Sequence, residues 1–306
     1  MKKLLLAAAA LLVAMPSLAE DKPVPSPGEI VAAAPKGDWV AIPASDLLVM
    51  DLAPDTKGKP RRVVIQLMPP PFSQGWIGNI HLLAAAHWWD GLSINRVQDN
   101  YVVQWGDANA EEKGKARALP AGLATVPESD YVQRVPAAEN EQLGKLKLID
   151  SYAEAIDDVG GFPLAQSGDY YWPVHCYGMV GVGRDLSPNT GSGAELYVVI
   201  GHAPRHLDRN IALVGRVIEG VEHLSSLPRG TGGLGFYETP KERTKIRSIR
   251  LGAEVKGLPT YEYLSTESQS FAAYADARAN RRDAFFIRPA GGADICNIPV
   301  PVRRVK

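Results

Sequence analysis

The segment from Ile94 to Asp107 constrains the fold of this chain more than any other part of the sequence. Its order is Ile94-Asn95-Arg96-Val97-Gln98-Asp99-Asn100-Tyr101-Val102-Val103-Gln104-Trp105-Gly106-Asp107. Short runs rich in β-branched and aromatic residues flank polar turn residues, which predicts a strand, a turn and a second strand. The segment also places one arginine, Arg96, eight residues before one glutamine, Gln104.

Further strand signals precede and follow this segment. The runs 47–52 and 62–67 are rich in Leu, Val and Ile, and the turn residues of 54–60 lie between them. This order predicts a β-hairpin. A later run, 245–251, alternates between polar and apolar residues and predicts a strand near the end of the main fold.

Helical spacing predicts two helices among these strands. Apolar residues recur at helical intervals over 79–88, where Asn79 is a suitable N-cap and Gly91 ends the helix. The second helix is expected over 221–227 and ends before Pro228. The chain is therefore expected to be mainly β.

A long segment without regular patterning, 108–172, interrupts this series. Its beginning is rich in charged residues, and its only amphipathic stretch is 146–156. We predict a loop insertion, which at this length is either functional or disordered.

A C-terminal extension, 253–306, follows the last predicted strand. The pattern Thr-Glu-Ser-Gln at 266–269 is a capping box that predicts the start of a helix. Short strand-like runs follow at 284–287 and 295–302. The helix is expected to present one face made of Phe271, Tyr274, Ala275 and Arg278.

The N-terminus has the pattern of a cleaved signal peptide. Lys2 and Lys3 precede an apolar run that is shorter than the roughly 20 residues of a membrane-spanning helix, and small residues end at Ala19. We predict a signal peptide over 1–19, followed by a flexible leader over 20–38, and export to a bacterial periplasm. No later segment is apolar enough to span a membrane.

The charge balance excludes an electrostatic basis for binding polyanions. Loss of Lys2 and Lys3 lowers the basic residues from 33 to 31 against 34 acidic ones, a net charge of about −3. We therefore expect no nucleic acid and no anionic membrane surface among the partners. We also expect a monomer.

The two cysteines, Cys176 and Cys296, leave two possibilities open. In an oxidising compartment they can form a disulfide that closes a loop of more than a hundred residues. Alternatively, they are free buried thiols that pack as small apolar side chains.

Four segments, taken in order, resemble the cyclophilin family of peptidyl-prolyl cis-trans isomerases. The resemblance covers about 47–251 and implies a closed eight-stranded antiparallel barrel with two helices over 39–252. The insertion and the C-terminal extension, packed on the barrel, would be additions to it. The four segments are Ile94 to Asp107, Ser187 to Ile200, His206-Leu207-Asp208 and Val214 to Gly220.

The resemblance implies a site that needs no nucleophile, metal or cofactor. Rotation about a peptide bond is slow because the nitrogen lone pair is delocalised into the carbonyl. A catalyst has to bind the twisted transition state more tightly than either planar isomer. Arg96 matches the catalytic arginine of the family, and Gln104 matches the glutamine that orients the substrate.

The substrate-binding positions follow from the same resemblance. Tyr101 and Val102 match residues that line the proline pocket, and Tyr197 matches the aromatic residue at its floor. Leu207 matches the leucine beside that floor, and His206 the residue that precedes it. The remaining contact is Glu195, which occupies a position where the family has a neutral amide.

The sequence departs from the family pattern in four places. Ile94-Asn95 replaces Phe-His before the arginine, Trp105 follows the glutamine, and Ile211 replaces a frequent histidine. Glu195 is the fourth, and two outcomes are open for it. It either pairs with Arg96, or it favours substrates with a nearby positive charge.

Other chemistries lack a supporting pattern. His202 and His206 are four residues apart, but Pro204 between them argues against a helical metal pair. The glycine-rich run 230–235 has no Gly-Lys-Ser/Thr after it, so we interpret it as a loop. We therefore expect an isomerase without metal or cofactor that acts on proline-containing exported polypeptides. The alternative is a catalytically weak module of the same fold that binds such peptides or acts as a chaperone.

Overall fold

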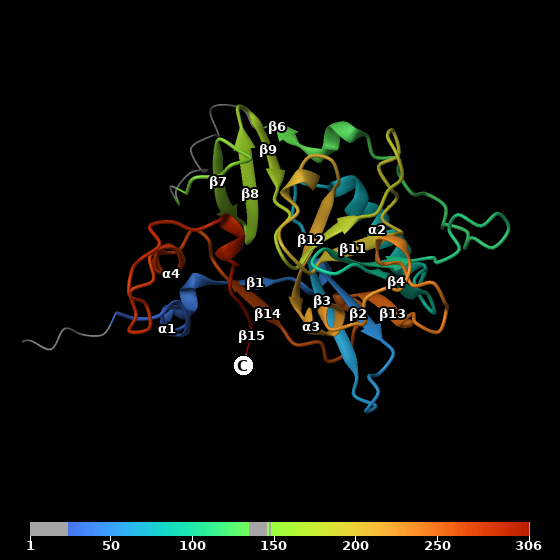
Figure 1. Ribbon diagram of the computed structural model, residues 1–306, viewed down its shortest axis with the longest axis horizontal. Coiled ribbons are helices and arrows are strands. Elements are labelled where there is room, and N and C mark those ends of the chain that lie inside the picture. Colours follow the sequence, from blue (N-terminus) through green and yellow to red (C-terminus); the bar gives the residue numbers. More distant parts are fainter. Residues whose placement is uncertain (1–23, 135–145, 147, 306) are drawn as a thin grey trace, which may run out of the picture.

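The computed structural model describes residues 24–134, 146 and 148–305. The predicted signal peptide lies outside these residues. A β-barrel forms the larger part of the molecule, and a smaller part built from both chain ends and the insertion lies beside it (Figure 1). No helix of the described part is both long and apolar enough to cross a membrane.

Eight antiparallel strands form the barrel. Their order in the sheet is β13-β2-β3-β12-β10-β11-β5-β4. The strands are β2 (Leu47–Leu52), β3 (Arg61–Leu67), β4 (Ser93–Val97), β5 (Val102–Gly106), β10 (Met179–Val182), β11 (Leu196–Val199), β12 (Leu213–Glu219) and β13 (Ile246–Leu251).

The two edge strands of this sheet, β4 and β13, nearly close the barrel. Ser93 forms an isolated bridge to Lys245, and the Ile246 amide donates to the Leu92 carbonyl at 2.8 Å. These contacts satisfy edge groups that an open sheet would expose. The prediction of a mainly β, eight-stranded antiparallel barrel is confirmed.

Two helices pack against the barrel: α2 (Gln74–Ala85) beside β13, and α3 (Glu222–Ser225) beside β3. The expected start of α2 is wrong. Asn79 is not the N-cap but a buried mid-helix residue, and its side chain exchanges two hydrogen bonds with the backbone of Ala124. An asparagine suits a cap or a buried polar contact equally well, so periodicity alone misplaced the boundary.

The insertion contains an ordered sheet where a long loop was expected. The Gly160-Gly161 pair has positive φ at both residues and forms a two-residue hairpin turn. No helix forms over the described residues of 146–156, and a strand of the sheet, β7, starts at Ala155. The strands, in sheet order, are β6 (Gln133–Arg134), β9 (Tyr170–Pro173), β8 (Phe162–Ser167) and β7 (Ala155–Val159).

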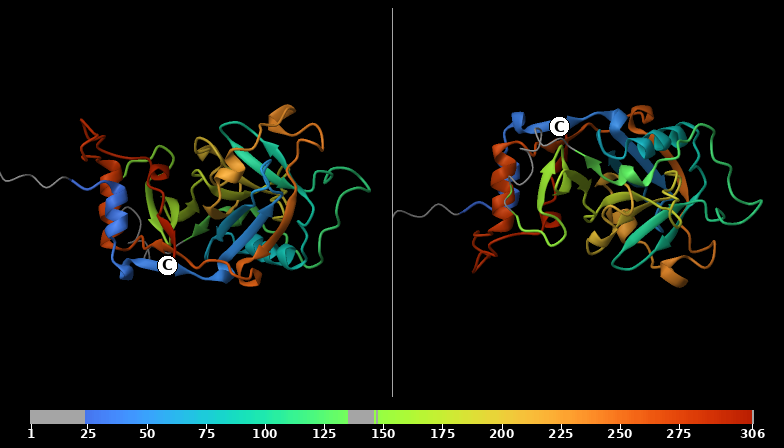
Figure 2. Two further views of the ribbon diagram at one scale, coloured as in Figure 1. Left: turned by 90° about the horizontal axis from the view of Figure 1, so that it is seen from below. Right: turned by 90° about the horizontal axis from the view of Figure 1, so that it is seen from above.

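The expected flexible leader also contains regular structure. Helix α1 (Pro27–Ala33) begins with a complete capping box between Ser26 and Glu29 and packs against α4 (Gln269–Ala279) of the extension (Figure 2). Strand β1 (Trp39–Ile42) pairs with β14 (Tyr261–Leu264). The third strand of this sheet, β15 (Val302–Arg304), pairs with β14.

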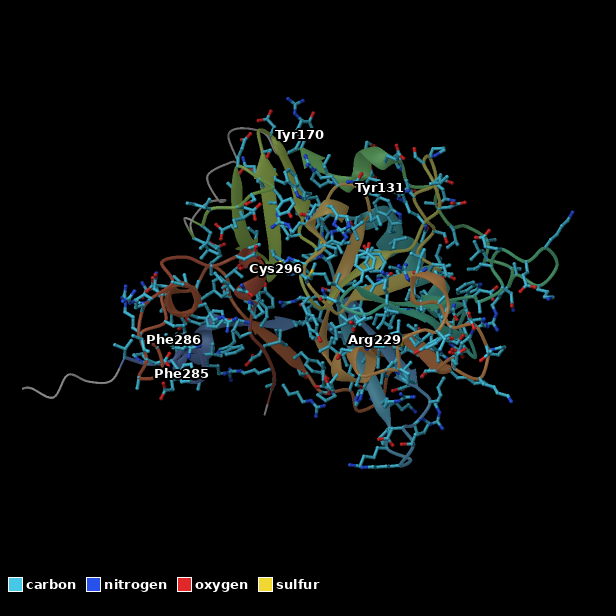
Figure 3. All side chains as sticks on the ribbon, viewed as in Figure 1. Tyr131, Tyr170, Arg229, Phe285, Phe286 and Cys296 are labelled. Atoms are coloured by element: carbon cyan, nitrogen blue, oxygen red, sulfur yellow. A yellow bond between two sulfur atoms is a disulfide. The ribbon has the colours of Figure 1, made fainter. Side chains whose placement is uncertain are left out.

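The last segment of the extension differs from the sequence prediction. Residues 284–287 form no strand; Phe285 and Phe286 are exposed on the smaller part of the molecule and contact each other edge to face (Figure 3). Residues 295–297 form a 3-10 turn, and a strand begins only at Val302. Both predicted runs have the composition of strands, but only the residues from Val302 onward pair with a neighbouring strand, β14.

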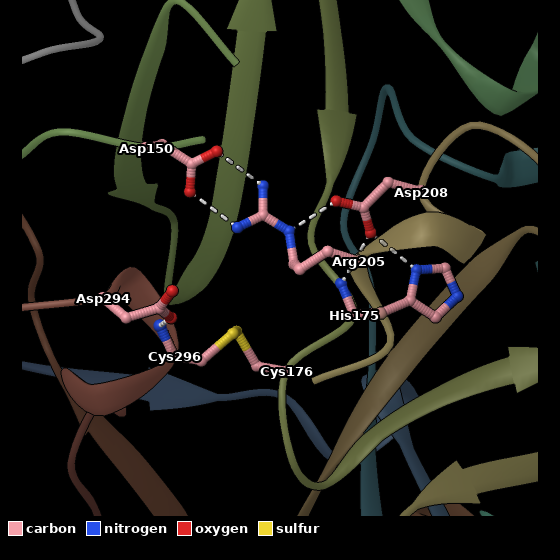
Figure 4. Close-up of a disulfide and its surroundings, with 7 residues drawn as sticks. All are labelled: Asp150, His175, Cys176, Arg205, Asp208, Asp294 and Cys296. Atoms are coloured by element: carbon pink, nitrogen blue, oxygen red, sulfur yellow. Dashed lines mark hydrogen bonds and ion pairs between the residues drawn. A yellow bond between two sulfur atoms is a disulfide. The ribbon is translucent and has the colours of Figure 1, made fainter. Parts of the chain in front are cut away.

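A disulfide joins the barrel to the extension. Cys176 lies just before β10 and Cys296 lies in the 3-10 turn of the extension, 120 residues later (Figure 4). Of the two possibilities that the sequence left open, the structure contains the bond.

Candidate active site

The β4–β5 hairpin brings Arg96 and Gln104 together. The two residues are direct partners in the antiparallel register, and an Nη1 hydrogen of Arg96 is donated to Oε1 of Gln104 at 3.3 Å. Residues eight apart across a tight turn face each other in a hairpin, so this spacing has a geometrical cause.

Further contacts hold the guanidinium of Arg96 in one plane. Its Nε donates to the carbonyl of Leu234 at 2.8 Å, and Nη2 donates to the side chain of Gln98. The charge lies over the rings of Tyr101 and Phe236, 5.6 and 5.3 Å from their centroids. Cation–π contacts of this kind orient a cation while leaving its edges free for a ligand.

Phe236 and Leu234 belong to the glycine-rich loop, which the sequence predicted only as a loop. The loop comes close to β4 because Gly235 has φ +80°, and a Cβ there would lie 2.6 Å from the Cα of Gln98. A glycine is therefore required at this position. The density of glycines was the one sequence signal for this wall of the site.

An apolar cluster of side chains, which we call the slot, lies on the strands beside the Arg96–Gln104 pair. Val102, Tyr197 and Val199 form a buried cluster, with Tyr101 and Ile211 packed against it. The register pairs Tyr197 with Gln104, so the ring lies on the strand next to the glutamine. The structure thus brings the predicted Tyr101, Val102 and Tyr197 together and adds Val199 and Ile211.

His206 and Leu207 lie on one 3-10 turn at the edge of this slot. The exposed imidazole of His206 stacks on the ring of Tyr101, with the ring centroids 6.4 Å apart. Leu207 is partly buried, and its carbonyl accepts a hydrogen bond from the Ile211 amide at 3.2 Å. Both predicted positions therefore border the slot.

Glu195 faces Gln104 and the backbone of β5, and does not pair with Arg96 in the part of the chain that is described. Its Oε1 accepts a hydrogen bond from the Asp107 amide at 2.8 Å. Burial raises the pKa of Glu195 to about 7, against the lowering effect of the hydrogen bonds from Asp107 and Gln104. The carboxyl therefore titrates near neutral pH.

Two other departures from the family pattern have structural roles. Trp105 points into the core and is fully buried, because alternate residues of β5 face opposite sides of the barrel wall. Asn95 is buried as well; its Nδ2 donates to the Gly106 carbonyl at 3.0 Å and its Oδ1 accepts from Ser93. Neither side chain belongs to the Val102–Tyr197–Val199 cluster.

A buried histidine that the sequence did not single out lies under the slot. His175 Nε2 is 2.8 Å from the hydroxyl of Tyr197, and Nδ1 is 2.8 Å from Oδ1 of Asp208. Burial lowers the pKa of His175 more than Asp208 raises it, so the ring is neutral at pH 7. Nothing in the local sequence around His175 distinguishes it from a core residue.

The described residues contain no cluster of three or more His, Cys, Asp or Glu side chains placed to hold a metal ion. The chemistry available here is that of a fixed cation, an amide and an apolar cluster. These are the groups expected of a prolyl isomerase, which has to donate a hydrogen bond to the lone pair of the proline nitrogen and hold the ring by apolar contact.

The comparisons with known proteins agree with this class. Residues 62–251 match the family described as cyclophilin-type peptidyl-prolyl cis-trans isomerase/CLD. The chain belongs to this family and is a peptidyl-prolyl cis-trans isomerase by that membership. No curated protein sequence matches the chain.

One solved structure shows the same fold. The cyclophilin AquaCyp293 from Hirschia baltica is 21% identical, with a TM-score of 0.63 over 87% of this chain and 93% of its own. A cyclophilin-type isomerase from Cryptosporidium parvum is 12% identical, with a TM-score of 0.39 over 67% of this chain and 97% of its own. The first similarity supports the fold of nearly the whole chain.

Proposed function

We propose that this isomerase accelerates X-Pro rotation in exported polypeptides, with Arg96 as the catalytic cation. The observation that carries the proposal is the Arg96–Gln104 pair held beside the Val102–Tyr197–Val199 slot. A proline ring in that slot would place its nitrogen near the guanidinium.

The mechanism follows from what rotation does to the peptide bond. Twisting removes the conjugation and returns the lone pair to the proline nitrogen, which then becomes a hydrogen-bond acceptor. Among the described residues, Leu234, Gln98 and Gln104 use three of the five N–H donors of Arg96. The remaining N–H groups can donate to the nitrogen only in the twisted state, which is differential binding of the transition state.

Gln104 and the slot supply orientation. The amide of Gln104 is held between Arg96 and Glu195, so it presents a fixed face to the substrate backbone. Tyr101, Val102 and Tyr197 enclose the ring by apolar contact. Preorganised groups of this kind do not have to reorient as the bond rotates.

Replacement of Arg96 by alanine tests this assignment. We expect the Arg96→Ala variant to lose catalysis by about 100-fold, the usual cost of removing one preorganised transition-state donor. The measurement is NMR exchange of an Ala-Pro test peptide with the mature chain. Arg247→Ala, which removes an exposed arginine of β13, is the matched control and should keep wild-type activity.

Two outcomes would contradict the assignment. Unchanged acceleration in Arg96→Ala would mean that another group stabilises the transition state. Peptide resonances that shift on binding to the wild-type chain without any acceleration would instead favour a binding or chaperone module.

Export of the chain is supported by its N-terminal sequence: two lysines, an apolar run and small residues up to Ala19. The substrates would then be chains that fold after translocation in the periplasm, where proline isomerisation is a slow step. Fractionation of bacteria that express the full chain should yield a periplasmic monomer whose first residue is Glu20. Full-length protein retained in the cytoplasm would contradict export.

A further inference from the structure

A network of buried polar side chains extends from the insertion to Tyr197 in the proline slot. Arg205 binds Asp150 through both terminal nitrogens, at 2.6 and 3.1 Å, and donates from Nε to Asp208 at 2.7 Å. Asp208 accepts from His175, and His175 meets the Tyr197 hydroxyl. Figure 4 shows the first four of these side chains in one row.

The side chains of the network are shielded from water. The side chains of Asp150, Arg205 and Asp208 are only 3 to 4% exposed, and that of His175 is 1% exposed. Charges alternate along it: negative, positive, negative, then the neutral imidazole. Buried ions are tolerated only when they are paired and hydrogen-bonded, so each member fixes its neighbours.

The arrangement also selects the tautomer of His175. The carboxylate of Asp208 can only accept, so Nδ1 carries the hydrogen and donates to it. Nε2 is then an acceptor for the Tyr197 hydroxyl. A carboxylate behind a histidine orients the ring in the same way in many sites.

The two ends of the network lie in different parts of the molecule. Tyr197 lies in the slot, and Asp150 belongs to the insertion, between β6 and β7. Arg205 also begins the 3-10 turn that carries His206, whose ring stacks on Tyr101. The network therefore connects the insertion both to Tyr197 and to the turn that carries His206.

We propose that His175, Arg205 and Asp150 are positioning residues through which the insertion sets substrate affinity in the proline slot. The proposal rests on the proposed role of Tyr197 in substrate binding. It assigns to the insertion a function in the isomerase site itself. These residues act through Tyr197 and the 205–207 turn, and none of them contacts the reacting bond.

A double-mutant cycle tests the inner end of the network. His175→Leu and Tyr197→Phe each remove one side of the same hydrogen bond. Each should weaken binding of an Ala-Pro peptide by about 10-fold, the usual effect of one lost buried hydrogen bond. The double variant should bind no more weakly than either single variant. His175→Gln, which can still accept from the hydroxyl, should restore much of the affinity.

The outer end is tested by two matched changes in the insertion. Asp150→Asn neutralises one of the two buried carboxylate partners of Arg205, whereas Asp169→Asn neutralises the partner in the exposed pair with Arg134. We expect Asp150→Asn alone to raise the peptide dissociation constant, with the exchange rate of bound peptide nearly unchanged. The ¹⁵N shifts of the His175 ring should move in Asp150→Asn and stay fixed in Asp169→Asn.

These readouts separate positioning from a purely structural role. All measurements are made well below the unfolding transition of each variant, so that lost stability does not lower the folded fraction. Additive effects in the cycle, or unchanged affinity and ¹⁵N shifts in Asp150→Asn, would overturn the proposal. Failure of the proposed catalytic site would give a different result, namely full activity in Arg96→Ala.

Discussion

At the scale of single residues, Glu195 is the side chain whose environment differs most from that of an exposed carboxyl. It lies against Gln104 and the backbone of Asp107, and burial raises its pKa to about 7. A carboxyl that is neutral below pH 7 offers Gln104 a donor, and one that is charged above pH 7 offers only acceptors. The protonation state of Glu195 therefore changes the hydrogen bonding of the catalytic pair.

This shift predicts a pH dependence of stability. The pKa of Glu195 is higher in the folded chain, at about 7, than its ordinary value of 4.5, so folding favours the protonated form. The stability it contributes is present below about pH 4.5 and is lost as the pH rises through about 7, by about 3 kcal/mol in total. Denaturant unfolding at pH 5 and pH 8 measures the difference.

Glu195→Gln should abolish this part of the pH dependence and be more stable than wild type at pH 8. Its amide oxygen can still accept from Asp107, and it carries no buried charge. Glu254→Gln, which changes an exposed carboxyl that does not act on Glu195, is the control and should behave like wild type. An equal fall in stability between the two pH values in wild type and Glu195→Gln would contradict the interpretation.

At the scale of elements, turns decide the composition of the site. The β4–β5 hairpin sets Arg96 opposite Gln104, and the close approach of Gly235 brings the ring of Phe236 to the guanidinium. The 205–207 turn carries His206 over Tyr101. The strands provide a rigid base, and these connections bear most of the contacts to a ligand, as is common for binding sites.

At the scale of the whole molecule, three segments far apart in sequence build the smaller part beside the barrel. Helix α1, the insertion and helix α4 meet there, around a core that includes Trp39, Leu264 and Phe271. The Cys176–Cys296 disulfide fastens this part to the barrel next to His175. The smaller part therefore has both a covalent and a polar connection to the isomerase site.

Removal of the disulfide should lower the stability of the whole molecule. A bond across 120 residues contributes about 5 kcal/mol in the chain-entropy model. Guanidinium unfolding of the oxidised chain, with and without reductant, measures the loss. The Cys176→Ala/Cys296→Ala variant should match the reduced chain and show no response to reductant. Equal unfolding midpoints for oxidised and reduced protein would contradict the estimate.

The sequence by itself determined the features that depend on neighbouring residues. Alternation and turn residues predicted the barrel hairpins, including the hairpin that sets Arg96 opposite Gln104. Predictions from neighbouring residues failed where one residue type suits two different structures. Asn79 suited a helix cap but is a buried residue, and the Gly160-Gly161 turn in the insertion was overlooked.

Only the tertiary structure decided which distant segments meet. Phe236 reaches Arg96 from 140 positions away, and Asp150 reaches Tyr197 only through Arg205, Asp208 and His175. No local pattern records such contacts, because each side chain alone is compatible with a surface or a core position. Packing of the whole chain excludes water from them, and that exclusion turns separate polar residues into one network.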